Sequence, residues 1–223
     1  MLKQTANILV ALLALTAASA FADEESVRKA FQARFPEEKV ISVAKTPYSG
    51  LYEVVIGNQL VYTDDKVKFM FVGSVLDAKT LQNLTEQRAL KHNAGRFASL
   101  PLDLAFKSVK GNGKRTLAVF SDPRCPYCKR LEKTLTEITD VTVYTFLYPI
   151  LGGSESLAKA IWCAPDRQKA WDDLMLREIQ PAAGGNCETP IARVMELGQQ
   201  MRVSGTPTLV FANGRIVSGA VPV

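Results

Sequence analysis

Two cysteines with two residues between them, Cys125 and Cys128, carry the clearest chemistry in this sequence. They follow an apolar run over 116–120 that is typical of a strand, and they precede a segment over 129–135 with the pattern of a helix. Because the backbone N–H groups at a helix start favour negative charge, the first sulfur is placed to be a thiolate. The thiolate is the species that attacks disulfides, so the spacing predicts thiol–disulfide exchange with Cys125 as the nucleophile.

The same spacing also occurs in zinc sites and in structural disulfides. A site with four cysteine ligands normally contains a second close pair, whereas Cys163 and Cys187 are far apart in this sequence. The single histidine, His92, lies in a polar stretch with no candidate ligand beside it. Redox chemistry is therefore favoured over zinc binding and over a purely structural bridge, and no metal or other cofactor is predicted.

The first 22 residues are typical of a cleaved signal peptide, with an uncleaved anchor as the alternative. They contain one charged residue, Lys3, an apolar core over 8–18, and small residues suited to cleavage near position 22. The core is shorter than a membrane-spanning helix, and no later segment approaches that length. The mature chain is therefore predicted to start near Asp23, to be exported, and to make no stable membrane insertion.

Export changes what the cysteines can do, because disulfides persist outside the cytosol. Four cysteines allow three pairings, of which the close pair Cys125–Cys128 is the natural first bridge. A second bridge would then join Cys163, on an apolar helical face, to Cys187 in a loop. Without the signal peptide the net charge falls from +5 to +4, and so mild and scattered a charge argues against nucleic acid as a partner.

The first half of the mature chain is predicted to be a small sheet domain. A helix over 24–34 ends at Pro36, and strand-like runs separated by turn residues follow it. A unit of about 50 residues buries too little surface for secure independent stability, so dimerisation through an edge strand is expected. The predicted strands cover 40–44, 51–56, 60–63 and 67–72.

The second half is predicted to be a larger α/β domain. Residues 80–98 indicate a polar helix, either a connector or a helix packed on the second domain. The redox motif leads to a strand over 141–148, and a Gly-Thr-Pro segment at 205–207 leads to a hairpin around an Asn-Gly turn. Three residues are candidate helix N-caps, namely Ser154, Asp166 and Thr189. The hairpin strands are predicted over 208–212 and 215–218.

The strand, the Cys-x-x-Cys at a helix start and the later Gly-Thr-Pro together resemble the thioredoxin fold. With Ile161-Trp-Cys163 and Val203-Ser-Gly-Thr-Pro207, nearly the whole mature chain resembles the DsbC/DsbG family of periplasmic thiol:disulfide isomerases. The resemblance implies an α+β N-terminal dimerisation domain and an α/β thioredoxin-like catalytic domain, joined by a linker helix. Its boundaries are 1–22 for the signal peptide, 23–79 for the first domain, 80–108 for the linker and 109–223 for the catalytic domain.

The resemblance also implies roles for particular residues. Cys125 and Cys128 would be the catalytic pair, and Cys163 and Cys187 would form a structural disulfide. Substrate would be held by three residues, namely Tyr127, Thr206 and Pro207, the last of them after a cis peptide bond.

The partners that the resemblance implies lie in the periplasm. Misfolded exported proteins would be the substrates, with wrong disulfides isomerised or reduced through a mixed disulfide on Cys125 and with chaperone-like binding. A membrane thiol reductase of the DsbD type would keep the catalytic pair reduced. The chain would form a V-shaped homodimer through its N-terminal domains, with the two active sites facing an apolar cleft.

Two departures from the family pattern stand out. The dipeptide between the cysteines is Pro126-Tyr127, as in glutaredoxins, whereas Gly-Tyr is commonest in the family, and this leaves the balance between isomerase and reductase open. The chain also ends at Val223, just after the last hairpin strand, where a thioredoxin fold continues into a helix. This favours a truncated sequence over a complete fold, with a remnant that has lost this helix as a further alternative.

Two other functions compete with the isomerase prediction. A dithiol oxidase like DsbA would keep Cys125 and Cys128 oxidised at rest, although that family lacks this N-terminal sheet and carries a longer helical insertion. A holdase chaperone would bind unfolded chains without using either cysteine.

Overall fold

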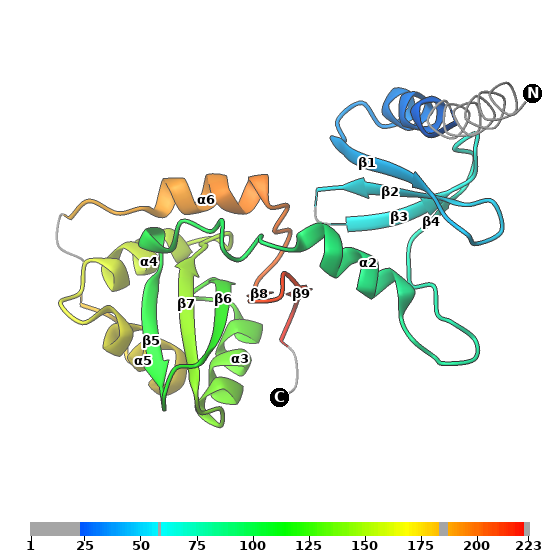
Figure 1. Ribbon diagram of the computed structural model, residues 1–223. Helices are drawn as coiled ribbons and strands as arrows, with labels where there is room; N and C mark the ends of the chain where they lie inside the picture. Colours follow the sequence, from blue (N-terminus) through cyan, green and yellow to red (C-terminus); the bar gives the residue numbers. More distant parts are fainter. Residues whose placement is uncertain (1–22, 58, 183–186, 221–223) are drawn as a thin grey trace, which may run out of the picture. The chain divides into compact units, whose positions relative to one another are not determined.

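The computed structural model describes residues 23–57, 59–182 and 187–220, so the predicted signal peptide lies outside the described residues. The chain divides into two compact units, with the boundary between Ala89 and Leu90 (Figure 1). Each unit has its own sheet and its own hydrophobic core. Within the described residues, no helix combines the length and the apolar character needed to cross a membrane.

The first unit is an antiparallel sheet packed against a helix whose described part covers 23–34. Val27 and Phe31 lie one helical turn apart and are buried against Val54 and Val61 of the sheet, which explains why this helix forms here. The predicted helix and the first three predicted strands are thereby confirmed. The sheet order is β1 (Val40–Lys45), β2 (Tyr52–Ile56), β3 (Gln59–Thr63) and β4 (Met70–Phe71).

The fourth strand is shorter than the predicted run over 67–72. The Asp64 carboxylate accepts hydrogen bonds from the backbone N–H groups of Lys68, at 2.7 Å, and Phe69, at 3.0 Å. These bonds hold a turn in which Val67 has a φ of 53° and is buried in the core. The turn uses residues that the apolar pattern assigned to the strand, so only Met70 and Phe71 pair with β3.

The other face of this sheet is covered by the first turns of α2 (Leu84–Asn93). Arg88 forms a 2.9 Å ion pair with the buried Glu53 of β2, and the Tyr62 and Thr85 hydroxyls are 2.8 Å apart. The helix is shorter than the predicted range 80–98. It begins after Asn83, whose side chain accepts the N–H of Glu86 at 2.9 Å as a cap.

The second unit is built on a five-stranded sheet with the order β5-β7-β6-β8-β9. Only β6 and β7 are parallel, and α3 is the crossover between them. The edge strand β5 begins inside the range predicted as a linker helix, 80–108, and the helices of that range are α2 and a short 3-10 helix, η1 (Leu102–Leu104). The strands are β5 (Phe106–Lys110), β6 (Arg115–Ser121), β7 (Val141–Leu147), β8 (Thr208–Phe211) and β9 (Ile216–Ser218).

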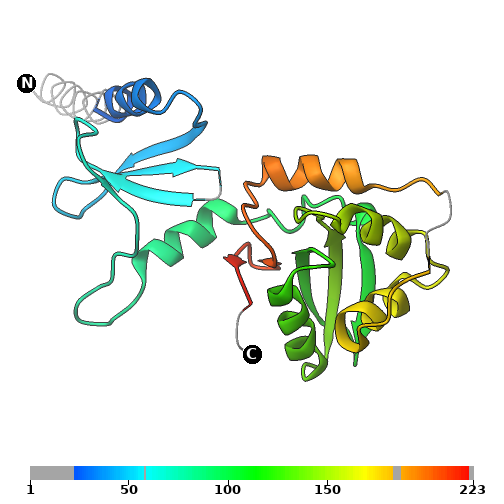
Figure 2. The same ribbon diagram turned by 180° about the vertical axis from the view of Figure 1, so that it is seen from behind.

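Helices cover both faces of this sheet (Figures 1 and 2). On one face, Leu117 and Val119 of β6 pack against Leu131 and Leu135 of α3. On the other face, Phe120 packs with residues of α6 and stacks on Phe146 of β7 with ring centroids 4.9 Å apart. The helices are α3 (Pro126–Thr136), α4 (Ser154–Trp162), α5 (Arg167–Arg177) and α6 (Ile191–Gln200).

The predicted helix caps are confirmed at one position and displaced by one residue at two others. Asp166 caps α5, because its side chain accepts the N–H of Lys169 at 2.9 Å. Gly153, in the left-handed conformation, takes the cap of α4 in place of Ser154. Pro190 takes the cap of α6 in place of Thr189.

Candidate redox site

The two cysteines of the motif lie at the start of α3, as their position after a strand predicted. Cys125 is the N-cap residue and Pro126 is the first helical residue, where its missing N–H costs no hydrogen bond. Both thiols are free, and both are buried, with 5% of Cys125 and none of Cys128 exposed. Their difference in exposure leaves Cys125 as the sulfur closer to solvent.

A loop from the far end of the chain completes the surroundings of Cys125. The Thr206–Pro207 peptide bond is cis, as the family resemblance implied, and it immediately precedes β8. The Cys125 thiol donates a hydrogen bond to the Thr206 carbonyl oxygen at 3.2 Å. The structure therefore brings Thr206 and Pro207 to the first cysteine, and it leaves Tyr127 with 56% of its surface exposed beside Arg130.

The second cysteine is held in a different electrostatic environment. Burial raises the pKa of Cys128 to about 12, and the Ser121 hydroxyl and the Asp122 N–H act in the opposite direction. The Asp122 N–H donates to the Cys128 sulfur at 3.4 Å. Cys128 is therefore protonated at neutral pH, which makes it a poor initial nucleophile.

A buried aspartate that the sequence analysis missed supports the loop before Cys125. The Asp122 carboxylate accepts hydrogen bonds from the Arg124 N–H at 2.7 Å, the Leu151 N–H at 2.9 Å and the Ser154 hydroxyl at 2.6 Å. Its side chain thereby joins the redox loop to the loop that follows β7. The only signal in the sequence is an acidic residue between an apolar strand and the motif.

A second buried acid lies one helical turn beyond Cys128. Glu132 is 7% exposed, and burial raises the pKa of its carboxyl to about 7, with the neighbouring Trp171 indole acting in the opposite direction. Its atom Oε1 has no hydrogen-bond partner within the described part of the chain. A glutamate in a charged helix gave no sign of this environment, because burial depends on α5 packing against α3.

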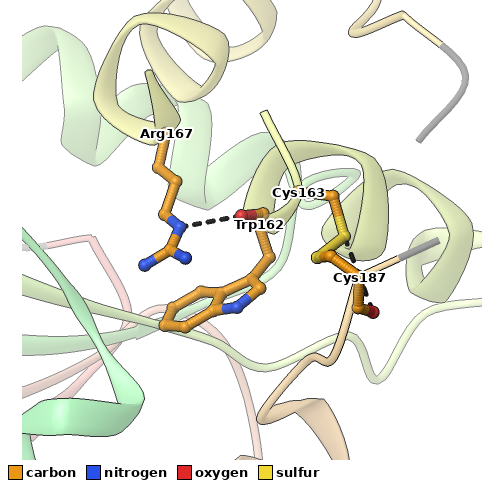
Figure 3. The surroundings of a disulfide bond; sticks show 4 residues. All are labelled: Trp162, Cys163, Arg167 and Cys187. Atoms are coloured by element: carbon orange, nitrogen blue, oxygen red, sulfur yellow. Dashed lines mark hydrogen bonds between the residues drawn. A yellow bond between two sulfur atoms is a disulfide. The ribbon is translucent and has the colours of Figure 1, made fainter. Parts of the chain in front are cut away.

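The other two cysteines form a disulfide, with their Cα atoms 5.7 Å apart (Figure 3). Cys163 is the C-cap residue of α4, and Cys187 lies 24 residues later in the loop before α6. Next to the bridge, the Arg167 guanidinium lies 3.8 Å from the centroid of the buried Trp162 ring, and its Nε donates to the Trp162 carbonyl at 2.7 Å. These contacts and the disulfide therefore hold the end of α4, the start of α5 and the loop before α6 together.

Across the described ranges, no group of three His, Cys, Asp or Glu side chains is arranged to hold a metal ion.

Comparison with known families agrees with both units. Residues 18–86 match the N-terminal domain of disulfide bond isomerase proteins, and residues 102–223 match the thioredoxin-like domain. A crystal structure of a disulfide interchange protein from Neisseria gonorrhoeae is 51% identical in sequence and has a TM-score of 0.53. That similarity covers 55% of this chain and 90% of the other.

Curated relatives match over most of the chain. The probable thiol:disulfide interchange protein DsbC of Bordetella pertussis is 46% identical over 199 residues, which cover 89% of this chain and 71% of the relative. DsbC of Escherichia coli K12 is 30% identical over 96% of this chain and 90% of the relative. These likenesses confirm the predicted resemblance and the two-domain fold class, and the chain belongs to the DsbC family of thiol:disulfide interchange proteins.

Proposed function

We propose that this chain isomerises or reduces wrong disulfides in exported proteins through a mixed disulfide on Cys125. The observation that carries the proposal is the asymmetry of the two thiols. Cys125 lies at a helix N-terminus with its sulfur 3.2 Å from the Thr206 carbonyl of a cis-proline loop. Cys128 is fully buried and has a raised pKa, so it is suited to act second.

The reaction begins when the Cys125 thiolate attacks one sulfur of a substrate disulfide. A Cys125–substrate disulfide forms, and the other substrate sulfur leaves as a thiolate. That thiolate can attack a second substrate disulfide, which forms one new substrate disulfide and releases another substrate thiolate. The released thiolate then attacks the substrate sulfur of the mixed disulfide, so that a further substrate disulfide forms and Cys125 leaves as a thiolate, and the substrate is isomerised without net oxidation. Alternatively, Cys128 attacks Cys125, the enzyme pair becomes a disulfide, and the substrate leaves as a reduced dithiol.

Substrate binding is assigned to the residues around Cys125. The backbone at Thr206 and Pro207 would lie along an extended substrate segment, since the Thr206 carbonyl is directed at the Cys125 sulfur. The exposed ring of Tyr127 would contact the substrate chain next to its cysteine. Cys163 and Cys187 would take no part in exchange and would only stabilise the catalytic unit.

A homodimer through the first unit is part of the proposal. Four consecutive apolar residues on and around the edge strand β4 are exposed, namely Phe69, Met70, Phe71 and Val72. An exposed apolar edge strand presents unpaired backbone groups and favours pairing with another chain. We therefore assign this edge to contact with a second copy.

We also propose a cellular setting for this chemistry. Periplasmic export through a signal peptide over 1–22 would supply disulfide-bonded substrates, and a membrane thiol reductase of the DsbD type would return Cys125 and Cys128 to the reduced form. Chaperone-like binding of unfolded chains would accompany catalysis. An oxidase like DsbA would instead require the pair to be oxidised at rest.

The first experiment is recovery of activity from a scrambled-disulfide substrate by the mature protein in a glutathione buffer. We expect recovery well above the buffer rate, and none with Cys125→Ser. Failure of folded wild-type protein would overturn the isomerase proposal. Two further measurements would then separate the alternatives. Trapping the thiols in periplasmic extracts would show an oxidised pair for an oxidase. A holdase would still suppress aggregation after both cysteines had been replaced.

A further inference from the structure

The hydroxyl group of Ser121 is buried without a hydrogen-bond partner within the described parts of the chain. Ser121 is the last residue of β6 and has no exposed surface. A buried polar group without a partner costs free energy, so such groups are few in native proteins, and a redox or catalytic role is one of their explanations. Ser121 lies at the end of the strand that leads to the redox motif.

The register of β6 directs Ser121 toward α3. Side chains alternate along a strand, and Leu117 and Val119 are on the face that packs against Leu131 and Leu135 of α3. Ser121 is the next residue on that face. Because α3 runs back along the strand, its first turn, which carries Cys128, lies opposite the strand end.

A direct contact agrees with this placement. The N–H of the next residue, Asp122, donates to the Cys128 sulfur at 3.4 Å. Three groups lower the pKa of Cys128 against the effect of burial, and the Ser121 hydroxyl has the largest effect, ahead of the Asp122 N–H and the Thr206 hydroxyl. Its proton is not used in another hydrogen bond, so it is available to a thiolate at Cys128.

We propose that Ser121 donates a hydrogen bond to the Cys128 thiolate and thereby speeds resolution of the mixed disulfide. This inference rests on the proposed roles of Cys125 and Cys128. In the step concerned, the Cys128 sulfur bonds to the Cys125 sulfur and the Cys125–substrate bond breaks. The enzyme dithiol is oxidised, the substrate sulfur is reduced, and the proton that Cys128 loses ends on the departing substrate thiol.

The consequence is control over the product. While the mixed disulfide persists, a substrate thiol can attack it and isomerise the substrate. Attack by Cys128 ends that period and releases a reduced substrate. Loss of the Ser121 hydroxyl should therefore shift the enzyme from reduction toward isomerisation, and not lower both activities together.

The test is a single turnover on the full mature protein. Cys125 is converted to its mixed disulfide with 2-nitro-5-thiobenzoate, and release of this coloured thiolate by Cys128 is followed as a function of pH. A hydrogen bond to a charged group is strong enough that Ser121→Ala should slow release about tenfold near neutral pH. It should also shift the rise of the release rate to higher pH. Ser121→Thr, which keeps the hydroxyl, should restore release.

Two controls separate this role from a structural one. Thr145→Val removes a hydroxyl that is also buried, on the neighbouring strand β7, and should leave the rate and pH profile unchanged. If Ser121→Ala does not fold, Ser121→Thr and Ser121→Val are compared, because they have similar volumes and differ in the hydroxyl.

The possible outcomes point to different failures. Wild-type release from Ser121→Ala, or equal rates for the Thr and Val variants, would overturn the inference about Ser121. No release from the wild-type protein, or equal release from Cys128→Ser, would overturn the proposed role of Cys128 itself.

Discussion

The two cysteine pairs of the second unit differ in the helix ends that they occupy. Cys125 is the N-cap residue of α3, next to the backbone N–H groups that have no partner within the helix, and both cysteines of its pair are free and buried. Cys163 is the C-cap residue of α4, where the helix dipole disfavours negative charge, and it is bonded to Cys187. Position on a helix thus separates a pair suited to exchange from a pair suited to remain closed.

The surroundings of the two pairs reinforce this difference. The Cys125 sulfur faces the backbone of the cis-proline loop, where we propose that an extended substrate segment forms hydrogen bonds. The bridge at Cys163 is flanked by the stacked side chains of Trp162 and Arg167, which fix the adjoining helices. One pair therefore lies beside the backbone groups that we propose bind substrate, and the other lies beside side chains that the protein uses for its own packing.

The largest effect is expected from Cys125→Ser. Since this change removes the nucleophile, disulfide isomerisation should fall to the rate of the buffer alone, while the unfolding temperature changes little. The measurement is recovery of a scrambled substrate, paired with a thermal melt. A Cys163→Ser/Cys187→Ser double variant is the matched control, because it should remain active below its melting temperature. Isomerisation at the wild-type rate by Cys125→Ser would contradict the division between the pairs.

The same double variant should show the second largest effect, on stability. The bridge closes a loop between residues 24 positions apart, and chain entropy predicts a loss of about 3 kcal/mol when it is removed. We expect the unfolding temperature of the catalytic unit to fall by roughly 10 °C. An unchanged melt would mean that the bridge is not a structural one, and a total loss of exchange in the folded variant would give it a catalytic role.

Much of this contrast was predictable because it depends on local sequence. The strand before Cys125, the helix after it and the turn at Asn213-Gly214 are signalled by periodicity and by turn residues. Strand β5 was missed because its five residues, Phe-Lys-Ser-Val-Lys, show no alternation of apolar and polar side chains. Strand β4 was overpredicted because the Asp64 turn takes residues from an apolar run.

The parts of the site that escaped prediction depend on contacts between distant segments. Asp122 is important because Leu151, in the loop after β7, and Ser154, at the start of α4, bond to it from 29 and 32 residues later in the chain. Glu132 and Ser121 acquire their properties only from burial by packed helices and strands. Composition and spacing identify which residues can react, whereas the groups that tune them become visible only in the folded chain.

The environment beneath the reduced pair predicts a pH effect on stability. Glu132 has a pKa raised by burial from its ordinary value near 4.5 to about 7, so the folded state binds the proton more tightly than the unfolded state. Stability should therefore decrease as pH rises from about 4.5 to 7 and then level off, with an upper bound of about 3 kcal/mol.

Glu132→Gln should remove this dependence. Its unfolding free energy should match that of the wild type near pH 4 and exceed it above pH 7, measured by denaturant unfolding across this range. Glu155→Gln, an exposed helix position paired with Lys159, is the matched control and should leave the pH profile nearly unchanged. A Glu132→Gln protein that is less stable than wild type at pH 8 would mean that the carboxylate is stabilised by groups other than those described.

The smallest effect is expected from Tyr127→Ala, which concerns substrate contact at the reactive pair. The Tyr127 ring is 56% exposed, and its contact within the chain is the Arg130 guanidinium, 5.6 Å from the ring centroid. An exposed cation–π contact is weak, so the unfolding temperature should hardly change. For a protein disulfide substrate, loss of one aromatic contact should lower kcat/KM by about two- to fivefold. For a small-molecule disulfide, which does not reach the ring, the rate should be unchanged.

The control for Tyr127→Ala is Val109→Ala, at an exposed apolar position on β5, which should affect neither substrate. Equal losses with both substrates would instead place the Tyr127 ring at the sulfur chemistry, because only an effect on Cys125 itself is independent of substrate size.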